Sequence, residues 1–394
     1  MAAVEGVQEK YALITRRLEL QSGFSGQELR TLLLEKKNLR FQWPTAPTGK
    51  PHIGYFIPWV KFADFIRAGG EVIVDIVDIY AYLVNYIHSW EEVLHRTTYY
   101  RCLVTAALKA MGIPLSRVKL PQSSTYQNSE SFSHDLWRIL ALSTLNDVRE
   151  TGDELGGTTM LSPLLTPLLQ ALSEEYYDID VQFGGKDQRG LFNLNERVMP
   201  QLGYRKRIHL LNDVLPGLTG AKMSSSHAQH TKIMFLDDPE TVNSKLESAV
   251  CIEGVAEGNG ILGILEHILF PVSEIRQLKL PAVFGCDSAN RTAVDKPISF
   301  CAPGCPQGTL LSVRITFNTD GNQETYRHYK SYKELEEDYV AKKVYPNALK
   351  LAVAEGLNAL LGAIRREYES NKEWQEADRL GYPEDWLDAP KAEL

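Results

Sequence analysis

Several features are scarce in this chain of 394 residues, and each scarcity excludes a class of protein. The chain has only five cysteines, an odd and scattered set that is typical of a reduced protein and not of a disulfide scaffold. No stretch approaches the roughly 20 apolar residues of a membrane span. The first twenty residues have neither the apolar run of a signal peptide nor the acid-poor composition of a transit peptide. We therefore expect a cytoplasmic protein without a membrane segment.

Basic side chains are also outnumbered, because 42 Lys and Arg stand against 50 Asp and Glu for a net charge of −8. This balance argues against bulk attraction to a polyanion, although a local basic patch would suffice for nucleic acid. Cys286, Cys301 and Cys305 lie close in sequence, but no fourth ligand with zinc-finger spacing accompanies them. We expect ordinary loop cysteines and no metal site formed by the protein.

The length and an ordinary globular composition, 44% hydrophobic and 23% charged, suit two domains. Helical and strand-like segments alternate to about residue 235, and the buried run 71–77 has Asp75 as its one discordant residue. This alternation predicts an α/β fold, with a Rossmann-like doubly wound parallel sheet in residues 1–235. Helical patterns dominate residues 236–394, which predicts a smaller helical domain with a Pro-, Gly- and Cys-rich insertion near 278–308.

A first glycine-containing string, PTGKPHIG, occupies residues 47–54, after a strand-like run that Pro44 breaks and before a helical pattern. Glycines let the backbone approach a nucleotide closely, and a helix N-terminus presents free N–H groups to phosphate. His52 is placed to donate a hydrogen bond to a phosphate, and Gly54 leaves room for an adenine ring. Taken alone, the string also fits a capped turn.

Two more strings follow. Residues 182–189, QFGGKDQR, end a strand-like run, and a carboxylate such as Asp187 just past a strand suits ribose hydroxyls. Residues 220–226, GAKMSSS, place Lys222 among small hydroxyl-bearing residues, where its charge can follow a leaving pyrophosphate. Taken singly, an ordinary turn explains the first string as well, and a solvated loop explains the second better.

Together, in this order and spacing, the three strings resemble the HIGH, GGxDQ and KMSKS-type motifs of the eukaryotic cytoplasmic tyrosyl-tRNA synthetase family, within class I. The resemblance runs from about residue 10 to 385, and only the 278–308 excursion looks foreign. It implies a diverged paralog that uses ATP and Mg²⁺ to make an aminoacyl-adenylate and passes the acyl group to tRNA, chiefly by positioning and charge stabilisation. It also implies a homodimer, formed through segments that here include 103–111 and 133–143, which carry apolar stripes.

The resemblance also implies roles for individual residues. Those implied in catalysis are Thr48, His52, Lys222, Ser224 and Ser225. Those implied in ATP binding are Gly49, Gly54, Gly185, Asp187 and Met223. Those implied in binding the amino acid are Gln42, Asp75, Tyr80, Thr166, Gln170, Ser173 and Gln188.

The departures from the family pattern lie in the amino-acid pocket. Gln42 and Ser173 replace a Tyr and an Asp that hydrogen-bond the tyrosine phenol, and Thr166 replaces a Tyr at the α-ammonium. Tyr80 replaces a pocket-side histidine, and Asp75 replaces an apolar residue. A site built for a hydroxyl rejects analogues that lack it, so losing both phenol partners removes the basis for choosing tyrosine. We predict altered specificity, with Asp75 contacting either a donor on the substrate or a protein donor.

A second set of departures concerns tRNA. The stretch 147–155 is mostly acidic and the stretch 243–248 is less basic than in the family, so phosphate contacts look weakened. Two alternatives to a tRNA ligase stay open. One is a paralog that transfers its acyl group to a non-tRNA acceptor in small-molecule biosynthesis. The other is an inactive regulatory or RNA-binding module, against which intact His52, Asp187 and Lys222 argue.

Overall fold

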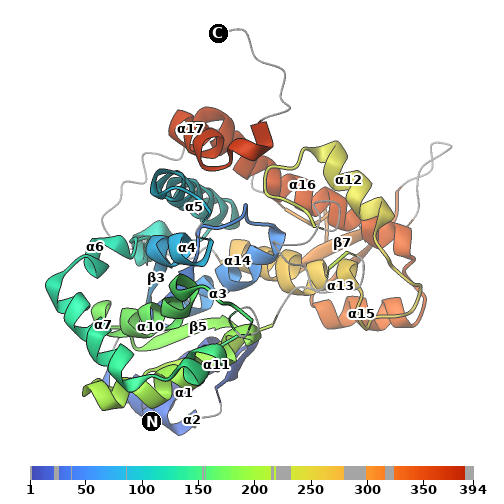
Figure 1. The fold of residues 1–394 in the computed structure, drawn as a ribbon. Coiled ribbons are helices and arrows are strands. Elements are labelled where there is room, and N and C mark those ends of the chain that lie inside the picture. Colours follow the sequence, from blue (N-terminus) through green and yellow to red (C-terminus); the bar gives the residue numbers. More distant parts are fainter. Residues whose placement is uncertain are drawn as a thin grey trace.

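The computed structural model describes residues 2–21, 26–36, 38–85, 87–152, 155, 157–213, 217–218, 232–278, 299–315 and 324–386. An α/β part built on one sheet holds the N-terminal half of the chain, and a mostly helical part follows it (Figure 1). No helix in these ranges is long and apolar enough to cross a membrane.

The sheet has six strands in the order β1-β6-β5-β2-β3-β4. The strands are β1 (Leu18–Leu20), β2 (Arg40–Thr45), β3 (Glu71–Ile76), β4 (Val118–Lys119), β5 (Val181–Gly185) and β6 (Ile208–Asn212). All neighbours run parallel except β1, which is antiparallel to β6 at one edge. The predicted doubly wound parallel sheet is confirmed. Winding proceeds outward in opposite directions from β2 and β5, so the space between their carboxyl ends is a topological switch point.

Helices connect and cover these strands. They are α1 (Ala2–Thr15), α2 (Gly26–Glu35), α3 (Phe56–Arg67), α4 (Asp78–Asn85), α5 (Trp90–Met111), α6 (Ser124–Gln127), α7 (Glu130–Leu142), α8 (Leu145–Arg149), α10 (Leu161–Tyr176) and α11 (Arg189–Val198). The long α5 begins at a capping box, in which the Ser89 side chain accepts from the Glu92 N–H and Glu92 accepts from the Ser89 N–H. It ends at Gly112, whose left-handed backbone suits glycine.

The second part of the chain is helical apart from one antiparallel hairpin. Its elements are α12 (Pro239–Ser248), α13 (Gly260–Ile264), a π-helical turn (Leu265–Leu269), α14 (Phe270–Leu278), β7 (Leu311–Arg314), β8 (Tyr326–Tyr329), α15 (Tyr332–Val340), α16 (Pro346–Ser370) and α17 (Lys372–Gly381). One hydrophobic core runs from Ile14 to Tyr382 and joins the sheet, α5, α14 and α16. The boundary at residue 235 therefore crosses a continuous core, and the two-domain division stays a prediction.

The strand β2 continues past the predicted break at Pro44 to Thr45. The backbone N–H and C=O groups of successive strand residues point alternately to the two neighbouring strands. The Thr45 carbonyl accepts from the Val77 N–H, on the side of β3. Pro44 therefore faces β5, where pairing already ends at Gln42 and Gln182. Its missing N–H costs no ladder hydrogen bond, so the proline is tolerated inside the strand.

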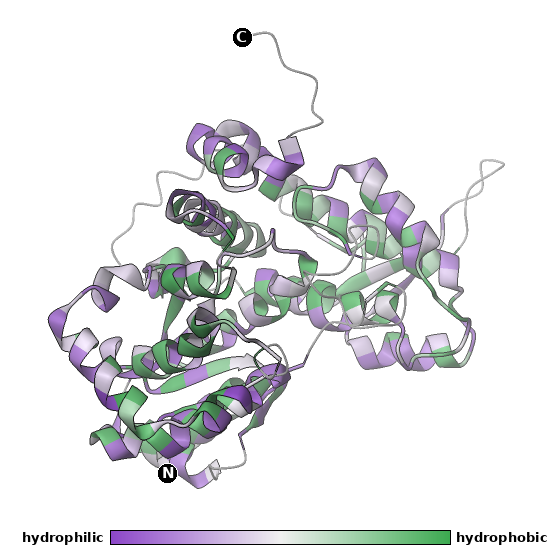
Figure 2. Ribbon diagram, in the orientation of Figure 1, coloured by the Kyte–Doolittle hydropathy of each residue, from purple (hydrophilic) through white to green (hydrophobic). Residues whose placement is uncertain are grey.

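The two faces of the sheet differ in polarity. Phe41, Val74 and Phe183 point into the large core beneath α3 and α5. On the other face Gln42 and Gln182, which pair across β2 and β5, are fully buried. Figure 2 shows hydrophobic residues concentrated where helices pack inward and hydrophilic residues on outer surfaces such as α15 and α17. A polar layer therefore lies inside the protein on one face of the sheet only.

The two segments predicted to form a dimer interface differ in exposure. Within 103–111 the apolar side chains, for example Leu103 and Leu108, are fully buried in the core of the same chain. By contrast, α7 leaves Trp137 66% exposed, and Leu140 and Leu142 beside it are also exposed. Of these two segments, α7 thus offers an apolar surface and 103–111 does not, and the dimer itself stays a prediction.

The insertion predicted near 278–308 falls largely on residues 279–298, including Cys286, which lie outside the described ranges. In the part that follows, the Cys301 thiol donates to the Thr309 carbonyl. Within the described residues no group of three His, Cys, Asp or Glu side chains is placed to hold a metal ion.

Candidate active site

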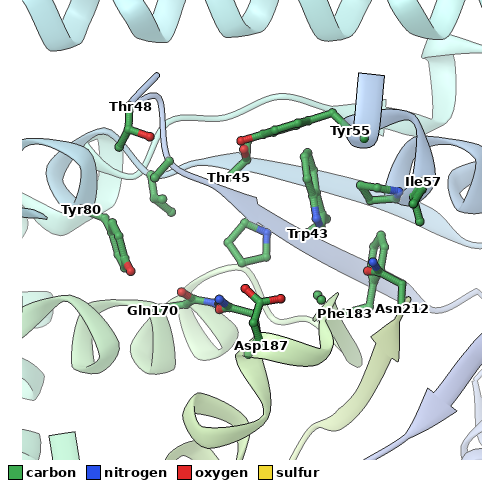
Figure 3. A pocket seen from close by; sticks show the side chains of 18 of the residues that line it. Trp43, Thr45, Thr48, Tyr55, Ile57, Tyr80, Gln170, Phe183, Asp187 and Asn212 are labelled. Atoms are coloured by element: carbon green, nitrogen blue, oxygen red, sulfur yellow. Dashed lines mark hydrogen bonds between the residues drawn. The ribbon is translucent and has the colours of Figure 1, made fainter. Parts of the chain in front are cut away.

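A cavity of about 360 Å³ opens at the carboxyl ends of β2 and β5, at the switch point of the sheet (Figure 3). Its described lining residues are 43–46, Thr48, His52, Gly54, Tyr55, Ile57, Pro58, Val77, Tyr80, Val84, Gln170, 183–185, Asp187, Gln188, Asn212 and Asp213. The loop after β2 and the turn after β5, which carry two of the three motifs, therefore face one space.

His52 stands at the start of the 3-10 turn Ile53–Tyr55, where its Nδ1 accepts from the Gly54 N–H at 3.1 Å. Burial, aided by the charge of Lys232, lowers the His52 pKa to about 4. The ring is therefore neutral near pH 7, and because Nδ1 is an acceptor, the proton resides on Nε2. A Cβ at Gly54 would lie 2.6 Å from His52 Cε1, so glycine is required for this packing. The arrangement leaves a neutral N–H donor at the cavity.

Asp187 lies in the 3-10 turn Lys186–Gln188 that follows β5. A Cβ at Gly185 would overlap Asp187 Oδ1, so the glycine lets the carboxylate fold back beside the strand end. Figure 3 shows Asp187 pointing into the cavity. This is a carboxylate acceptor in the place where an α/β sheet holds ribose.

Three of the residues implied in amino-acid binding also line the cavity. Tyr80 comes from α4, Gln170 from α10 and Gln188 from the turn after β5. The Gln170 Nε2 donates to Gln188 Oε1 at 3.5 Å. Polar groups from three separate elements thus line one cavity, and Figure 3 shows Tyr80 and Gln170 among them.

Gln42, Thr166, Ser173 and Asp75 are fully buried and are not among the described residues that line the cavity. The Gln42 Nε2 donates to Ser173 Oγ at 2.8 Å and to Asp75 Oδ2 at 3.1 Å. Its Oε1 accepts from the Gln182 Nε2 at 2.8 Å. Both N–H groups of the Gln42 amide are therefore engaged by the protein.

Asp75 accepts two further hydrogen bonds, from the Ser123 hydroxyl at 2.9 Å and the Tyr177 hydroxyl at 3.0 Å. Burial, with a smaller contribution from the charge of Asp78, raises the Asp75 pKa to about 7, against the opposing effect of its donors. Of the two interpretations left open, the structure shows Asp75 paired with protein donors.

The other two buried residues bond their own helix. The Ser173 hydroxyl donates to the Gln170 carbonyl at 2.6 Å, and the Thr166 hydroxyl donates to the Pro163 carbonyl at 2.7 Å. Both are local bonds within α10. The hydroxyl protons of Ser173 and Thr166 are thus donated to backbone carbonyls of the same helix.

Lys222, Met223, Ser224 and Ser225, from the third motif, lie outside the described residues. The segment that follows them is described. The Ile53 N–H donates to the Ile233 carbonyl at 3.0 Å, and His52 forms a β-bridge with Met234. The chain leaving the third motif is therefore anchored beside the first motif.

Sequence reasoning missed several residues at the cavity. Asn212 and Asp213 follow β6 as Asp187 follows β5, so the same rule about polar residues at strand ends would have found them. Lys232, 4% exposed, lies close enough to His52 to lower its pKa, which the sequence does not indicate. Tyr55 is partly buried, and its hydroxyl is hydrogen-bonded to Thr45 and Tyr100.

Comparison with known proteins identifies the family. A model of the tRNA synthetases of class I (W and Y) matches residues 34–279, more than half of the chain. The chain belongs to this class I family. The predicted relationship is thereby confirmed, and with it the enzyme class, a ligase of the aminoacyl-tRNA synthetase type.

Three relatives show how far the likeness of this class I synthetase extends. The cytoplasmic tyrosine–tRNA ligase of Saccharomyces cerevisiae is 36% identical over 387 residues, which cover 97% of this chain and 90% of that protein. The cytoplasmic enzyme of Gallus gallus is 37% identical over 386 residues, but these cover only 65% of its length. The crystal structure of Archaeoglobus fulgidus tyrosyl-tRNA synthetase with L-tyrosine is 30% identical, with a TM-score of 0.73 over 92% of this chain and 99% of that one.

Proposed function

We propose that this synthetase activates an amino acid with ATP in the cavity between β2 and β5 and then transfers it to tRNA. A carboxylate oxygen of the amino acid attacks the α-phosphorus, the bond to the β-phosphate oxygen breaks, and pyrophosphate leaves. A hydroxyl of the terminal tRNA ribose then displaces AMP. The observation that carries the proposal is the convergence of His52 and Asp187 on one cavity, with residues 233–234, beyond the third motif, bonded beside His52.

The described groups fit ATP. His52 offers a neutral N–H to a phosphate oxygen, and Asp187 offers a carboxylate to the ribose hydroxyls. Gly54 and Gly185 stand where any Cβ would collide with these two side chains. Mg²⁺ would come with ATP and take most of its ligands from phosphates and water.

The remaining family roles belong to the same proposal. In the first motif, Thr48 would stabilise the reacting phosphate, and the Gly49 backbone would approach the nucleotide. In the third motif, Met223 would contact ATP, and Lys222, Ser224 and Ser225 would stabilise the leaving pyrophosphate. These groups would act by stabilising the transition state, without a protein nucleophile.

We further propose that tyrosine is not the preferred amino acid. A phenol needs an acceptor for its proton, yet Gln42 and Ser173 satisfy each other and Asp75 already holds three donors. Opening this network for a phenol would leave buried polar groups unpaired. Gln170 and Gln188 would hold the amino-acid head, and Tyr80 would face the amino acid where the family has a histidine. A polar or basic amino acid, or a tyrosine whose oxygen is alkylated, suits a site without a free phenol acceptor.

One observation favours an acceptor other than tRNA as the second candidate. Asp147, in the acidic stretch, pairs with Arg197 at 2.8 Å and neutralises a cation on the surface of α11. Phosphate contacts dominate nucleic-acid affinity, so each neutralised cation weakens tRNA binding. A charging assay on bulk tRNA, with the amino acid that best supports ATP–pyrophosphate exchange, separates the candidates: the tRNA proposal requires an acid-precipitable aminoacyl product. Exchange without charging would favour a small-molecule acceptor.

A further inference from the structure

Three consecutive residues of the first motif are held from the side opposite the cavity. The Thr48 carbonyl accepts from Arg96 at 2.8 Å, and the Gly49 carbonyl accepts from the Tyr100 hydroxyl at 2.6 Å, both from α5. The Lys50 ammonium is 2.7 Å from Asp378 Oδ1 and 2.7 Å from Asp385 Oδ2. Besides the bond from the Thr48 N–H to the Ala46 carbonyl within the loop, these contacts connect the loop to α5 and to the C-terminal segment.

Lys50 faces away from the ATP cavity. It lines a separate hollow together with Tyr99, Tyr368 and Asp378. Two carboxylates neutralise its charge, and its ammonium lies 5.1 Å from the Tyr382 ring centroid. A lysine inside a phosphate-binding motif therefore anchors the loop and does not offer its charge to phosphate.

Arg96 makes a second connection between the first-motif loop and the C-terminal segment. Its Nε donates to the Gly381 carbonyl at 2.6 Å while its NH1 donates to Thr48, and the guanidinium lies 4.6 Å from the Tyr382 ring centroid. The side chain is 3% exposed. One fixed fork of donors therefore ties the end of α17 to the ATP loop.

The end of α17 approaches α5 so closely that a side chain at Gly381 would crowd Arg96. A Cβ at Gly381 would lie 3.0 Å from the Arg96 nitrogen and 3.1 Å from Arg96 Cγ. Next to it Tyr382 is buried and packs edge-on against Tyr99, with ring centroids 5.3 Å apart. The contact is a packed interface and not a chance surface ion pair.

We propose that the segment 378–385 positions the ATP-binding loop, with Asp378 as a positioning residue that acts through Lys50. The inference rests on the proposed function, because the loop is taken to hold ATP. Small displacements of a binding loop weaken its contacts with the nucleotide and disturb the alignment of the reacting groups. The C-terminal segment, distant in sequence, is thereby a component of nucleotide binding.

The first experiment compares the full-length Asp378→Asn, Asp378→Glu and Lys50→Met variants by ATP–pyrophosphate exchange. The expected result is a KM for ATP raised about tenfold in Asp378→Asn, with the KM for the amino acid unchanged and partial recovery in Asp378→Glu. The double variant Lys50→Met/Asp378→Asn should be no worse than Lys50→Met, because Asp378 reaches the loop through Lys50 and the Tyr368 hydroxyl, which donates to Asp378 at 2.8 Å, keeps an acceptor after substitution by asparagine. Glu376→Gln, an exposed residue of the same helix with the same charge change, is the control and should match the wild type.

A second readout does not depend on activity. Hydrogen exchange without nucleotide should quicken about tenfold in peptides covering 46–54 of Asp378→Asn, and not in Glu376→Gln. An Asp378→Asn variant with unchanged loop exchange and an unchanged KM for ATP overturns the inference. Absence of pyrophosphate exchange in the wild type with every amino acid overturns the proposed function instead, and faster loop exchange in Asp378→Asn would still support the tether.

Discussion

The Gln42 Nε2 donates a hydrogen bond to Ser173 Oγ across 2.8 Å, so the two residues expected at the phenol-binding positions of a tyrosyl pocket bind each other. The second N–H of the Gln42 amide goes to Asp75. The end of the pocket that would recognise a substrate hydroxyl is therefore occupied by protein hydrogen bonds. The departure from the family that we propose therefore concerns specificity and not the ATP site.

Restoring the family pattern should restore tyrosine activation. The triple variant Gln42→Tyr/Asp75→Leu/Ser173→Asp supplies a charged acceptor, worth ~1.5–3 kcal/mol or roughly ten- to a hundredfold in affinity for tyrosine. Asp75→Leu alone is the control and should gain nothing, because Gln42 then loses an acceptor without any phenol partner being added. Pyrophosphate exchange at varied tyrosine concentration measures both. Equal tyrosine KM values in wild type and in a folded triple variant would argue against the network as the determinant.

The ATP motifs should govern the chemical step. His52→Ala removes a neutral donor at the cavity, and Lys222→Ala removes the cation expected to follow pyrophosphate. Each should slow adenylate formation by about 10²-fold or more, as expected for the loss of one transition-state contact. Single-turnover adenylate formation is the measurement, with Glu376→Gln as the unaffected reference. Wild-type rates of adenylate formation in both variants would contradict the proposed mechanism.

The raised pKa of Asp75 predicts a pH-dependent stability. Its pKa is about 7 in the folded chain, against 3.8 for an ordinary aspartate. Between these values the folded state binds more protons than the unfolded state, so the free energy of unfolding falls as pH rises, by at most roughly 1.4 kcal/mol per pH unit. The contribution of Asp75 to the free energy of unfolding is fully present below pH 3.8 and is lost completely above pH 7.

The Asp75→Asn variant isolates this effect, because every other titrating group is shared. The free energy of unfolding of the wild type minus that of Asp75→Asn, from urea titrations, should fall between about pH 5 and 7 and then level off. A difference that stays constant or rises over this range would show that Asp75 remains charged throughout.

The exposed apolar surface of α7 should form the centre of a symmetric dimer. Trp137 is 66% exposed, and large aromatic side chains at interface centres carry much of the binding energy. Trp137→Asp should therefore convert a dimer to monomers in sedimentation velocity at micromolar concentration. Tyr345→Asp, which alters an aromatic residue exposed by 64% in the helical part, should leave the dimer intact. A wild-type monomer would contradict the expected assembly.

Local patterns in the sequence were enough to predict the sheet and to place Asp187 at a strand end. The sequence also marked Asp75 as a charge on a buried strand. It could not say what pairs with it, because Ser123 and Tyr177 lie 48 and 102 residues away and meet Asp75 only in the fold. The proton position on His52 was unpredictable for a similar reason, since it depends on the Gly54 N–H in a particular turn.

ATP–pyrophosphate exchange across a panel of amino acids tests the central claim most directly. The panel should contain tyrosine, O-methyltyrosine, and basic and uncharged polar amino acids. We predict that the wild type catalyses exchange and that at least one acid exceeds tyrosine in kcat/KM by roughly tenfold or more, in line with the lost charged acceptor. Preference for tyrosine over every other acid would contradict the account of the closed pocket, and the chain would then be a plain tyrosyl-tRNA synthetase.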